Sequence, residues 1–238
     1  MVLFLLFIGM NGSGKSHQMK KWLRLNKRNL ILPASRADKQ WLGIPELVPE
    51  VRFVRDRMNP SGNGKRAMFV VPGIDDFTGT RVVHIEGSDL EREGIFNAII
   101  HPQHGYHNGG MFMDDAKNYI RAKGNLPGHV RTFWGNRRLH MVDIFMAAWQ
   151  FQDVNADFYG FGGLQSFVFN VERPPNRSVL EKCPDPEALL LAYNRSCLHN
   201  RRLPSNKRWH FEPCPPIQSS QNERQGSTPG AAEDRRRG

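Results

Sequence analysis

Short apolar runs alternate with mixed-polarity segments along most of this chain. The runs cover residues 1–8, 29–32, 81–85, 109–113, 142–148 and 164–171. Such runs are typical of strands that are buried on both faces of a parallel sheet. The intervening segments 15–25, 89–100, 127–139 and 186–198 predict helices. We therefore expect an α/β fold, with a mostly parallel central sheet covered by helices on both faces.

Two segments depart from this alternation. Residues 51–55 and 67–71 are apolar-rich and flank a turn containing Asn59, Pro60 and Gly62, which predicts a β-hairpin inserted at about 51–72. From residue 203 the chain is rich in Pro, Ser, Gln, Gly and Arg, which predicts a largely disordered tail. The expected organisation is one domain over residues 1–202 and a flexible basic tail over 203–238.

The first apolar run leads directly into a glycine-rich loop, Gly9-Met10-Asn11-Gly12-Ser13-Gly14-Lys15-Ser16. The order strand, G-x-x-x-x-G-K-S, helix is the context of a P-loop, whose backbone N–H groups surround a nucleotide β-phosphate. Lys15 is expected to contact the β- and γ-phosphates, and Ser16 to ligate Mg²⁺. The predicted ATP-binding residues are Gly9, Asn11, Gly12, Ser13, Gly14, Lys15, Ser16 and His17.

Polar side chains follow two later apolar runs. Asp114 and Asp115 end the run at 109–113, where a P-loop enzyme holds Mg²⁺, so Asp114 is a candidate metal ligand. Asp115 could activate the attacking water. Gln150 follows the run at 142–148 and could contact the γ-phosphate, because the carboxyl ends of parallel strands form the ligand crevice.

The charge distribution indicates a polyanionic partner. The chain has a formal net charge of +10, and residues 117–140 contain basic but no acidic side chains. Arg137 and Arg138, in that stretch, are candidates to neutralise the γ-phosphate of a neighbouring subunit. The hairpin segment is also basic, and its candidate DNA contacts are Arg55, Arg57, Lys65 and Arg66. For any one of these side chains a solubilising surface role is an equally good interpretation.

Together these motifs resemble the FtsK/HerA superfamily of P-loop motors, especially the genome-packaging ATPases of tailless icosahedral viruses. The matching pieces are the Gly9–Ser16 loop, the Phe112–Asp115 strand end, the Arg137–Asp143 segment and the strand ending in Gln150, and they span about residues 2–172. Many superfamily members carry Glu where this chain has Asp115. The shorter side chain changes the reach to the attacking water and leaves the assignment of the base open.

The resemblance implies an ATP- and Mg²⁺-dependent hydrolase that pumps DNA into a preformed capsid as a hexameric or pentameric ring. It implies capsid-vertex or internal membrane proteins as further partners, and a location in the host cytoplasm or virion. No apolar run is long enough for a transmembrane helix, which argues against a related alternative, a Zot-like phage assembly ATPase. A small-molecule kinase and an adaptor that binds ATP without turnover remain as alternatives of other classes.

Overall fold

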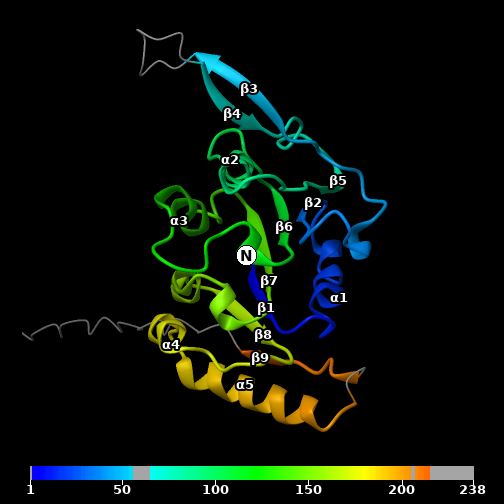
Figure 1. Cartoon of the computed structure of the whole chain (residues 1–238), viewed down its shortest axis with the longest axis vertical. Helices are drawn as coiled ribbons and strands as arrows, with labels where there is room; N and C mark the ends of the chain where they lie inside the picture. Colours follow the sequence, from blue (N-terminus) through cyan, green and yellow to red (C-terminus); the bar gives the residue numbers. More distant parts are fainter. Residues whose placement is uncertain (1, 56–64, 205–206, 215–238) are drawn as a thin grey trace, which may run out of the picture.

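A seven-stranded sheet forms the centre of the part of the chain that the structure describes (Figure 1). The structure is a computed structural model and describes residues 2–55, 65–204 and 207–214. The strands lie side by side in the order β5 (Gly79–Val82), β2 (Arg28–Leu32), β6 (Gly109–Met113), β7 (Val142–Ala148), β1 (Phe4–Ile8), β8 (Leu164–Val168) and β9 (Glu212–Cys214). Neighbouring strands pair in parallel except β8 and β9, which are antiparallel. The predicted mostly parallel α/β sheet is confirmed.

Both faces of this sheet are covered, which explains why its central strands lack an apolar–polar alternation. Every residue of β1 is buried. Phe4, Leu6 and Ile8 face one hydrophobic cluster, which includes residues of α2 (Asp89–Ile99) and α3 (Gly128–Gly135). Leu5 and Phe7 face a second cluster that includes Met19 of α1 (Lys15–Lys20). The two-residue period of a strand thus divides one apolar run between two layers.

The remaining helical segments pack around these layers. α4 (Arg177–Lys182) and α5 (Pro186–Arg201) contribute Val179 and Leu189 to the first cluster. Short 3₁₀ turns follow several strands and helices, at Leu23–Leu25, Lys39–Trp41, Ala116–Asn118, Phe151–Asp153 and Ala156–Gly160. Within the described ranges, no helix combines the length and hydropathy that crossing a bilayer requires.

The boundaries of several predicted elements differ from those observed. β7 has the predicted limits, and α2 begins after Ser88 as expected. The Ser88 hydroxyl accepts a hydrogen bond from the Glu91 backbone N–H, and the Glu91 carboxylate accepts one from Ser88, a reciprocal cap. The helix predicted at 127–139 ends at Gly135, and the one predicted at 15–25 ends at Lys20 and continues as a 3₁₀ turn. In both segments the helix-like sequence pattern extends several residues beyond the point at which the α-helix ends.

The predicted hairpin is present as a separate two-stranded sheet that projects from the α2 side of the molecule (Figure 1). β3 (Glu50–Arg55) pairs antiparallel with β4 (Lys65–Val70), with Arg55 opposite Lys65. The predicted turn at 59–64 lies outside the described residues. Phe69 packs directly over Gly94 of α2, where any larger side chain would collide with its ring. The hairpin is thus anchored at one end to the main domain.

The chain re-enters the sheet after α5. β9 pairs with β8, with Cys214 opposite Ser166, so the fold includes residues up to 214. The sequence predicted that the domain ends at residue 202, and the pairing of β9 shows that the sheet includes residues as far as Cys214. Pro213 is at the outermost strand, where its missing N–H costs no ladder hydrogen bond to a further strand. Residues 215–238 of the predicted tail lie outside the described part of the chain.

Candidate nucleotide-binding site

The glycine-rich loop connects the carboxyl end of β1 to the first turn of α1. The backbone N–H of Gly9 donates to Ala148 O at 3.0 Å and that of Met10 donates to Asn170 O at 2.8 Å, which fixes the loop between β7 and the end of β8. A Cβ atom at position 9 would lie 2.6 Å from Cβ of Phe169, so only glycine fits there. Gly14 precedes α1 with φ of 91°, a left-handed conformation that glycine adopts without strain.

Lys15 is the first residue of α1, and its ammonium group folds back over the loop. Nζ donates hydrogen bonds to Gly9 O at 2.5 Å and Met10 O at 3.0 Å. The side chain is buried, and burial lowers the pKa of Lys15 to about 8, although Asp114 and Asp115 act in the opposite direction. A nearby phosphate would favour the protonated form, so this cation is suited to an anionic ligand.

Asp114 lies directly beyond β6 and is held by two side-chain donors. The Ser16 hydroxyl donates to Asp114 Oδ2 at 3.0 Å, and the indole N–H of Trp41 donates to the same oxygen at 3.1 Å. Burial raises the pKa of Asp114, and the two hydrogen bonds partly offset that shift. Ser16 and Asp114, expected as a metal-binding pair, are therefore adjacent and bring together the hydroxyl and carboxylate oxygens that Mg²⁺ prefers.

Asp115 has a different environment from its neighbour. Its backbone is left-handed, with φ of 65°, and its Oδ1 atom is buried with no hydrogen-bond partner among the described residues. Its Oδ2 atom lies 3.7 Å from Nζ of Lys117, whose ammonium group also lies 4.1 Å from the centroid of the Trp149 ring. Burial raises the pKa of Asp115 and Lys117 lowers it. A buried carboxylate with one unused oxygen has the properties of a general base.

The loop and the two aspartates border one open pocket of about 560 Å³. Its walls come from the ends of β1, β2, β6 and β7, because parallel strands that end at the same edge leave a crevice there. The lining residues are Asn11, Gly12, Ser13, Gly14, Lys15, Ser16, His17, Ala34, Ser35, Asp38, Gln40, Asp114, Asp115 and Trp149. Gly9, the first residue of the loop, does not line the pocket. All the other predicted nucleotide-binding residues border it together with Asp114 and Asp115.

Gln150 follows β7 as predicted but does not line this pocket. Its side-chain amide lies 3.3 Å from Oε2 of Glu172, and its backbone N–H donates to Asp153 at 3.1 Å. The preceding residue, Trp149, borders the pocket instead. The Gln150 side chain is therefore directed to Glu172.

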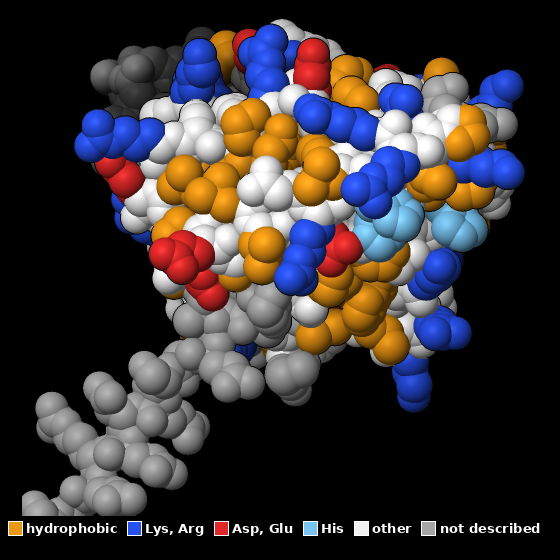
Figure 2. Space-filling view, turned by 90° about the horizontal axis from the view of Figure 1, so that it is seen from below, with side chains coloured by type: hydrophobic (Ala, Val, Ile, Leu, Met, Phe, Trp, Pro, Cys, Tyr) orange, Lys and Arg blue, Asp and Glu red, His pale blue; other side chains and the backbone are white. Residues whose placement is uncertain are grey.

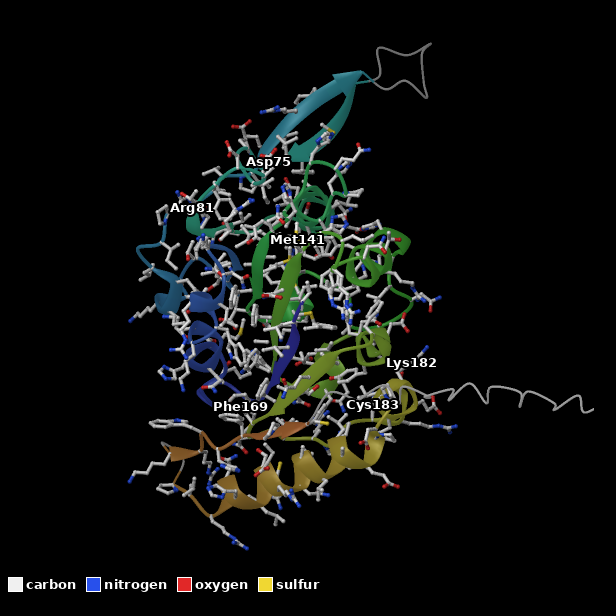
Figure 3. All side chains as sticks on the ribbon, turned by 180° about the vertical axis from the view of Figure 1, so that it is seen from behind. Asp75, Arg81, Met141, Phe169, Lys182 and Cys183 are labelled. Atoms are coloured by element: carbon white, nitrogen blue, oxygen red, sulfur yellow. The ribbon has the colours of Figure 1, made fainter. Side chains whose placement is uncertain are left out.

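Arg137, expected to act on a neighbouring subunit, is instead enclosed within its own chain in this structure. Its side chain is buried, donates to Trp134 O at 2.9 Å and to Gly162 O, and packs 5.5 Å from the ring centroid of Phe4. Arg138 is exposed. It lies in the turn before β7, next to Met141, at the opposite end of the sheet from Phe169 and the phosphate loop (Figure 3). Only Arg138 of this pair can reach beyond its own chain.

The four predicted DNA-binding residues belong to the projecting hairpin. Arg55 is the last residue of β3, and Lys65 and Arg66 open β4. Arg57 lies outside the described residues, as do the side chains of the other three. The neighbouring Phe53 is 68% exposed, so the described part of the hairpin offers an accessible surface.

Several residues at this site were not expected from the sequence, and three of them contact the predicted residues or border the pocket: Trp41, Lys117 and Trp149. Trp41 is buried and lies in the loop after β2. The carboxyl end of β2 is next to that of β6, so the order of the strands would have placed this loop at the site. Lys117 and Trp149 are each within two residues of a predicted site residue.

Comparison with known proteins gives a match at the level of the fold. No family model and no curated protein matches the chain. Among solved structures, the genome packaging NTPase B204 from Sulfolobus turreted icosahedral virus 2, in complex with AMP, matches with a TM-score of 0.57 and 12% identity. This match covers 89% of the chain and 91% of B204.

Two further structures of this kind match over a similar length. The AMPPCP complex of B204 gives a TM-score of 0.54 at 13% identity and covers 88% of this chain and 90% of B204. The B204 DNA-packaging ATPase from Sulfolobus Turreted Icosahedral Virus gives 0.53 at 12% identity, with coverage of 90% and 97%. The chain has the fold of these packaging NTPases. The match covers nearly the whole length of both chains.

Proposed function

We propose that this protein is an ATP-hydrolysing DNA translocase that pumps a viral genome into a preformed capsid. The observation that carries the proposal is the convergence of Lys15, Ser16 and the two aspartates on one pocket. A second, independent support is the fold shared with B204, a genome packaging NTPase described in complexes with AMP and AMPPCP. Phosphate-loop chemistry and a packaging fold therefore favour the same function.

In the proposed reaction, the loop backbone and Lys15 hold the triphosphate of ATP, and Asp115 accepts a proton from the attacking water. Proton transfer to Asp115 is favoured by burial, which raises its pKa above that of an exposed carboxyl. Lys117, with Nζ 3.7 Å from Oδ2, restrains the carboxylate, while Oδ1 has no hydrogen-bond partner among the described residues. Transfer of the γ-phosphoryl group needs positioning and charge neutralisation above all, and these residues supply both.

Mg²⁺ fits the oxygens of Ser16 and Asp114. In the described ranges no group of three His, Cys, Asp or Glu side chains converges to hold a metal. Mg²⁺ in NTPase sites commonly uses one or two protein ligands together with phosphate oxygens and water, so two oxygens suffice. When bound there, the ion would neutralise charge on the β- and γ-phosphates.

DNA is the proposed cargo, and the projecting hairpin is the proposed gripping element. Its basic residues would contact the DNA backbone as hydrolysis moves subunits of a ring, hexameric or pentameric. Arg138, exposed at the far end of the sheet, is the remaining candidate to act on a neighbouring subunit. Gln150 could sense the γ-phosphate only after its hydrogen bond to Glu172 is broken.

The surface below α5 provides a second basic region. Figure 2 shows Lys and Arg side chains spread over this lower face. Arg195 and Arg201 of α5, and Arg202 directly after it, are exposed. We propose that the protein works in the host cytoplasm or at the capsid vertex, where vertex or internal membrane proteins would be its partners.

The deciding experiment measures ATP hydrolysis with and without DNA. A rate that DNA stimulates, and that Lys15→Ala abolishes, supports the translocase. Phosphate transferred to a small metabolite would support a P-loop kinase, and ATP binding without turnover would support an adaptor. DNA affinity should fall steeply with salt, because phosphate contacts release counterions. A salt-independent affinity would contradict the proposed basic hairpin.

A further inference from the structure

Trp209 lies beside the phosphate loop, on the opposite side from the two aspartates. A Cβ atom built on Gly14 would lie 3.9 Å from Cβ of Trp209, and no nearer atom of another residue approaches that position. The Trp209 side chain is 60% exposed. A large aromatic side chain is thus exposed to solvent where the loop meets α1.

The segment that carries Trp209 is fixed in place by buried groups. The Asn200 side chain is fully buried and forms two hydrogen bonds with the backbone of His210: its Nδ2 donates to His210 O at 2.9 Å, and its Oδ1 accepts from His210 N at 3.2 Å. The ring of Phe211 packs 5.0 Å from that of Phe169. Phe169 in turn lies against Gly9 at the start of the loop. The contacts from Phe211 to Phe169, and from Phe169 to Gly9, therefore hold the segment that carries Trp209 next to the phosphate loop.

The order of the strands determines which part of a nucleotide would reach Trp209. Asp114 and Asp115 follow β6, two strands to one side of β1, whereas β9 lies two strands to the other side. Figure 1 shows the chain between α5 and β9 beside the start of α1. A nucleotide held at its β-phosphate, with its γ-phosphate toward the aspartates, extends its nucleoside away from them. That direction leads toward Trp209.

We propose that Trp209 forms the stacking surface for the purine base of the bound nucleoside triphosphate, an inference that rests on the nucleotide-binding function proposed above. An indole ring stacks on any base because every base has a π-face, and it favours purines through their larger area. Stacking reads no hydrogen-bond pattern, so ATP and GTP should bind with similar affinity, and CTP and UTP more weakly. The exposed, anchored indole is consistent with such a surface.

The test compares ligands with and without a base, using the full chain and Mg²⁺. Calorimetry of ATP and of inorganic tripolyphosphate separates stacking from phosphate binding, because tripolyphosphate has no ring. Trp209→Ala should weaken ATP binding by about 5- to 150-fold, the range that corresponds to losing one base–aromatic stack, and leave tripolyphosphate binding unchanged. Trp209→Phe should fall between wild type and Trp209→Ala.

Leu198→Ala is the matched control, since Leu198 is an exposed apolar residue of the neighbouring α5, and it should change neither affinity. Equal weakening of ATP and tripolyphosphate binding by Trp209→Ala would mean that Trp209 supports the loop rather than the base. Unchanged ATP affinity would also overturn the proposal. If wild type binds neither ligand, the proposed nucleotide-binding function itself fails, and this result is distinct from both.

Discussion

The hydroxyl of Ser16 donates a hydrogen bond of 3.0 Å to Oδ2 of Asp114, which lies 98 residues further along the chain. This contact joins the start of α1 to the end of β6 across the intervening strand β7. It brings together two oxygens that could share a metal ion.

Removing the Ser16 hydroxyl should weaken the binding of Mg²⁺ that hydrolysis requires. Ser16→Ala deletes one oxygen and one donor to Asp114, so the Mg²⁺ concentration for half-maximal ATP hydrolysis should rise by about 10- to 100-fold. A Mg²⁺ titration of the hydrolysis rate measures this effect. Ser16→Thr retains the hydroxyl and should stay close to wild type. An unchanged Mg²⁺ requirement in Ser16→Ala would remove Ser16 from the proposed ligand pair.

Asp115→Asn should reduce turnover while preserving ATP binding. The amide is similar in size to the carboxylate but cannot accept the proton of the attacking water, so kcat should fall by about 10²- to 10⁴-fold. The Kd for ATP, measured by calorimetry, should change by less than about threefold, because a catalytic proton acceptor contributes little to ground-state binding. Asp115→Glu is the control that restores a carboxylate. A kcat for Asp115→Asn close to that of wild type would show that another group activates the water.

Trp41→Phe should affect the metal site through Asp114. The substitution retains a buried aromatic ring but removes the N–H that donates to Asp114 at 3.1 Å. Loss of an outer-shell partner of this kind costs about 10- to 100-fold in metal affinity. We therefore expect a higher Mg²⁺ requirement for hydrolysis, measured as for Ser16→Ala.

Trp22→Phe is the comparison for Trp41→Phe. The Trp22 ring packs 6.0 Å from that of Phe145 on the same face of the sheet. Its substitution should change packing but not the Mg²⁺ requirement. If both variants raise that requirement equally, the effect comes from packing alone, and Trp41 has no role in positioning Asp114.

Local sequence patterns predicted most of the sheet and the chemistry at its carboxyl edge. β7 was predicted with its observed limits because the apolar run Val142–Ala148, interrupted only by Asp143, ends at Trp149 and Gln150. The loop and the two aspartates were predicted because each directly follows a strand. Such features depend on neighbours in the sequence, and the parallel topology then brings them together.

The parts that could not be predicted depend on contacts between distant segments. β9 has only three residues and gains its place from pairing with β8 and from Asn200. Arg137 and Arg138 are identical in type and adjacent, yet one is buried and the other exposed. Their difference follows from the carbonyl of Gly162, 25 residues away, which no local pattern reveals.

Substituting Arg137 and substituting Arg138 should therefore have different effects on the free energy of unfolding. Arg137→Ala removes the side-chain donors to Trp134 O and Gly162 O and the contact of the buried guanidinium with Phe4, so the free energy of unfolding should fall by about 2–4 kcal/mol. Arg138→Ala removes an exposed side chain and should change that free energy by less than about 0.5 kcal/mol. Urea unfolding followed by circular dichroism measures both.

Hydrolysis measurements then test the role of Arg138. If it neutralises charge on a neighbour's nucleotide, Arg138→Ala should lower the DNA-stimulated rate without loss of stability, and adding wild-type subunits should partly restore that rate. An Arg138→Ala protein with full activity at ring-forming concentrations would exclude this arginine as the trans-acting group.

ATP affinity should depend on pH through Lys15. In the free protein burial lowers the pKa of Lys15 to about 8, whereas the negative phosphates of bound ATP stabilise the ammonium form and raise it. The bound state then holds a proton that the free state loses as pH rises through 8. The Kd should be nearly constant below about pH 7 and rise about tenfold per pH unit above 8.

Proton uptake on binding should grow from about 0.1 proton at pH 7 to about 0.9 proton at pH 9, which calorimetry in buffers of different ionisation enthalpy measures. Lys15→Arg remains charged over this range, so its weaker binding should not vary with pH. A wild-type Kd that stays flat from pH 7 to 9.5 would mean that Lys15 keeps its proton in the free protein.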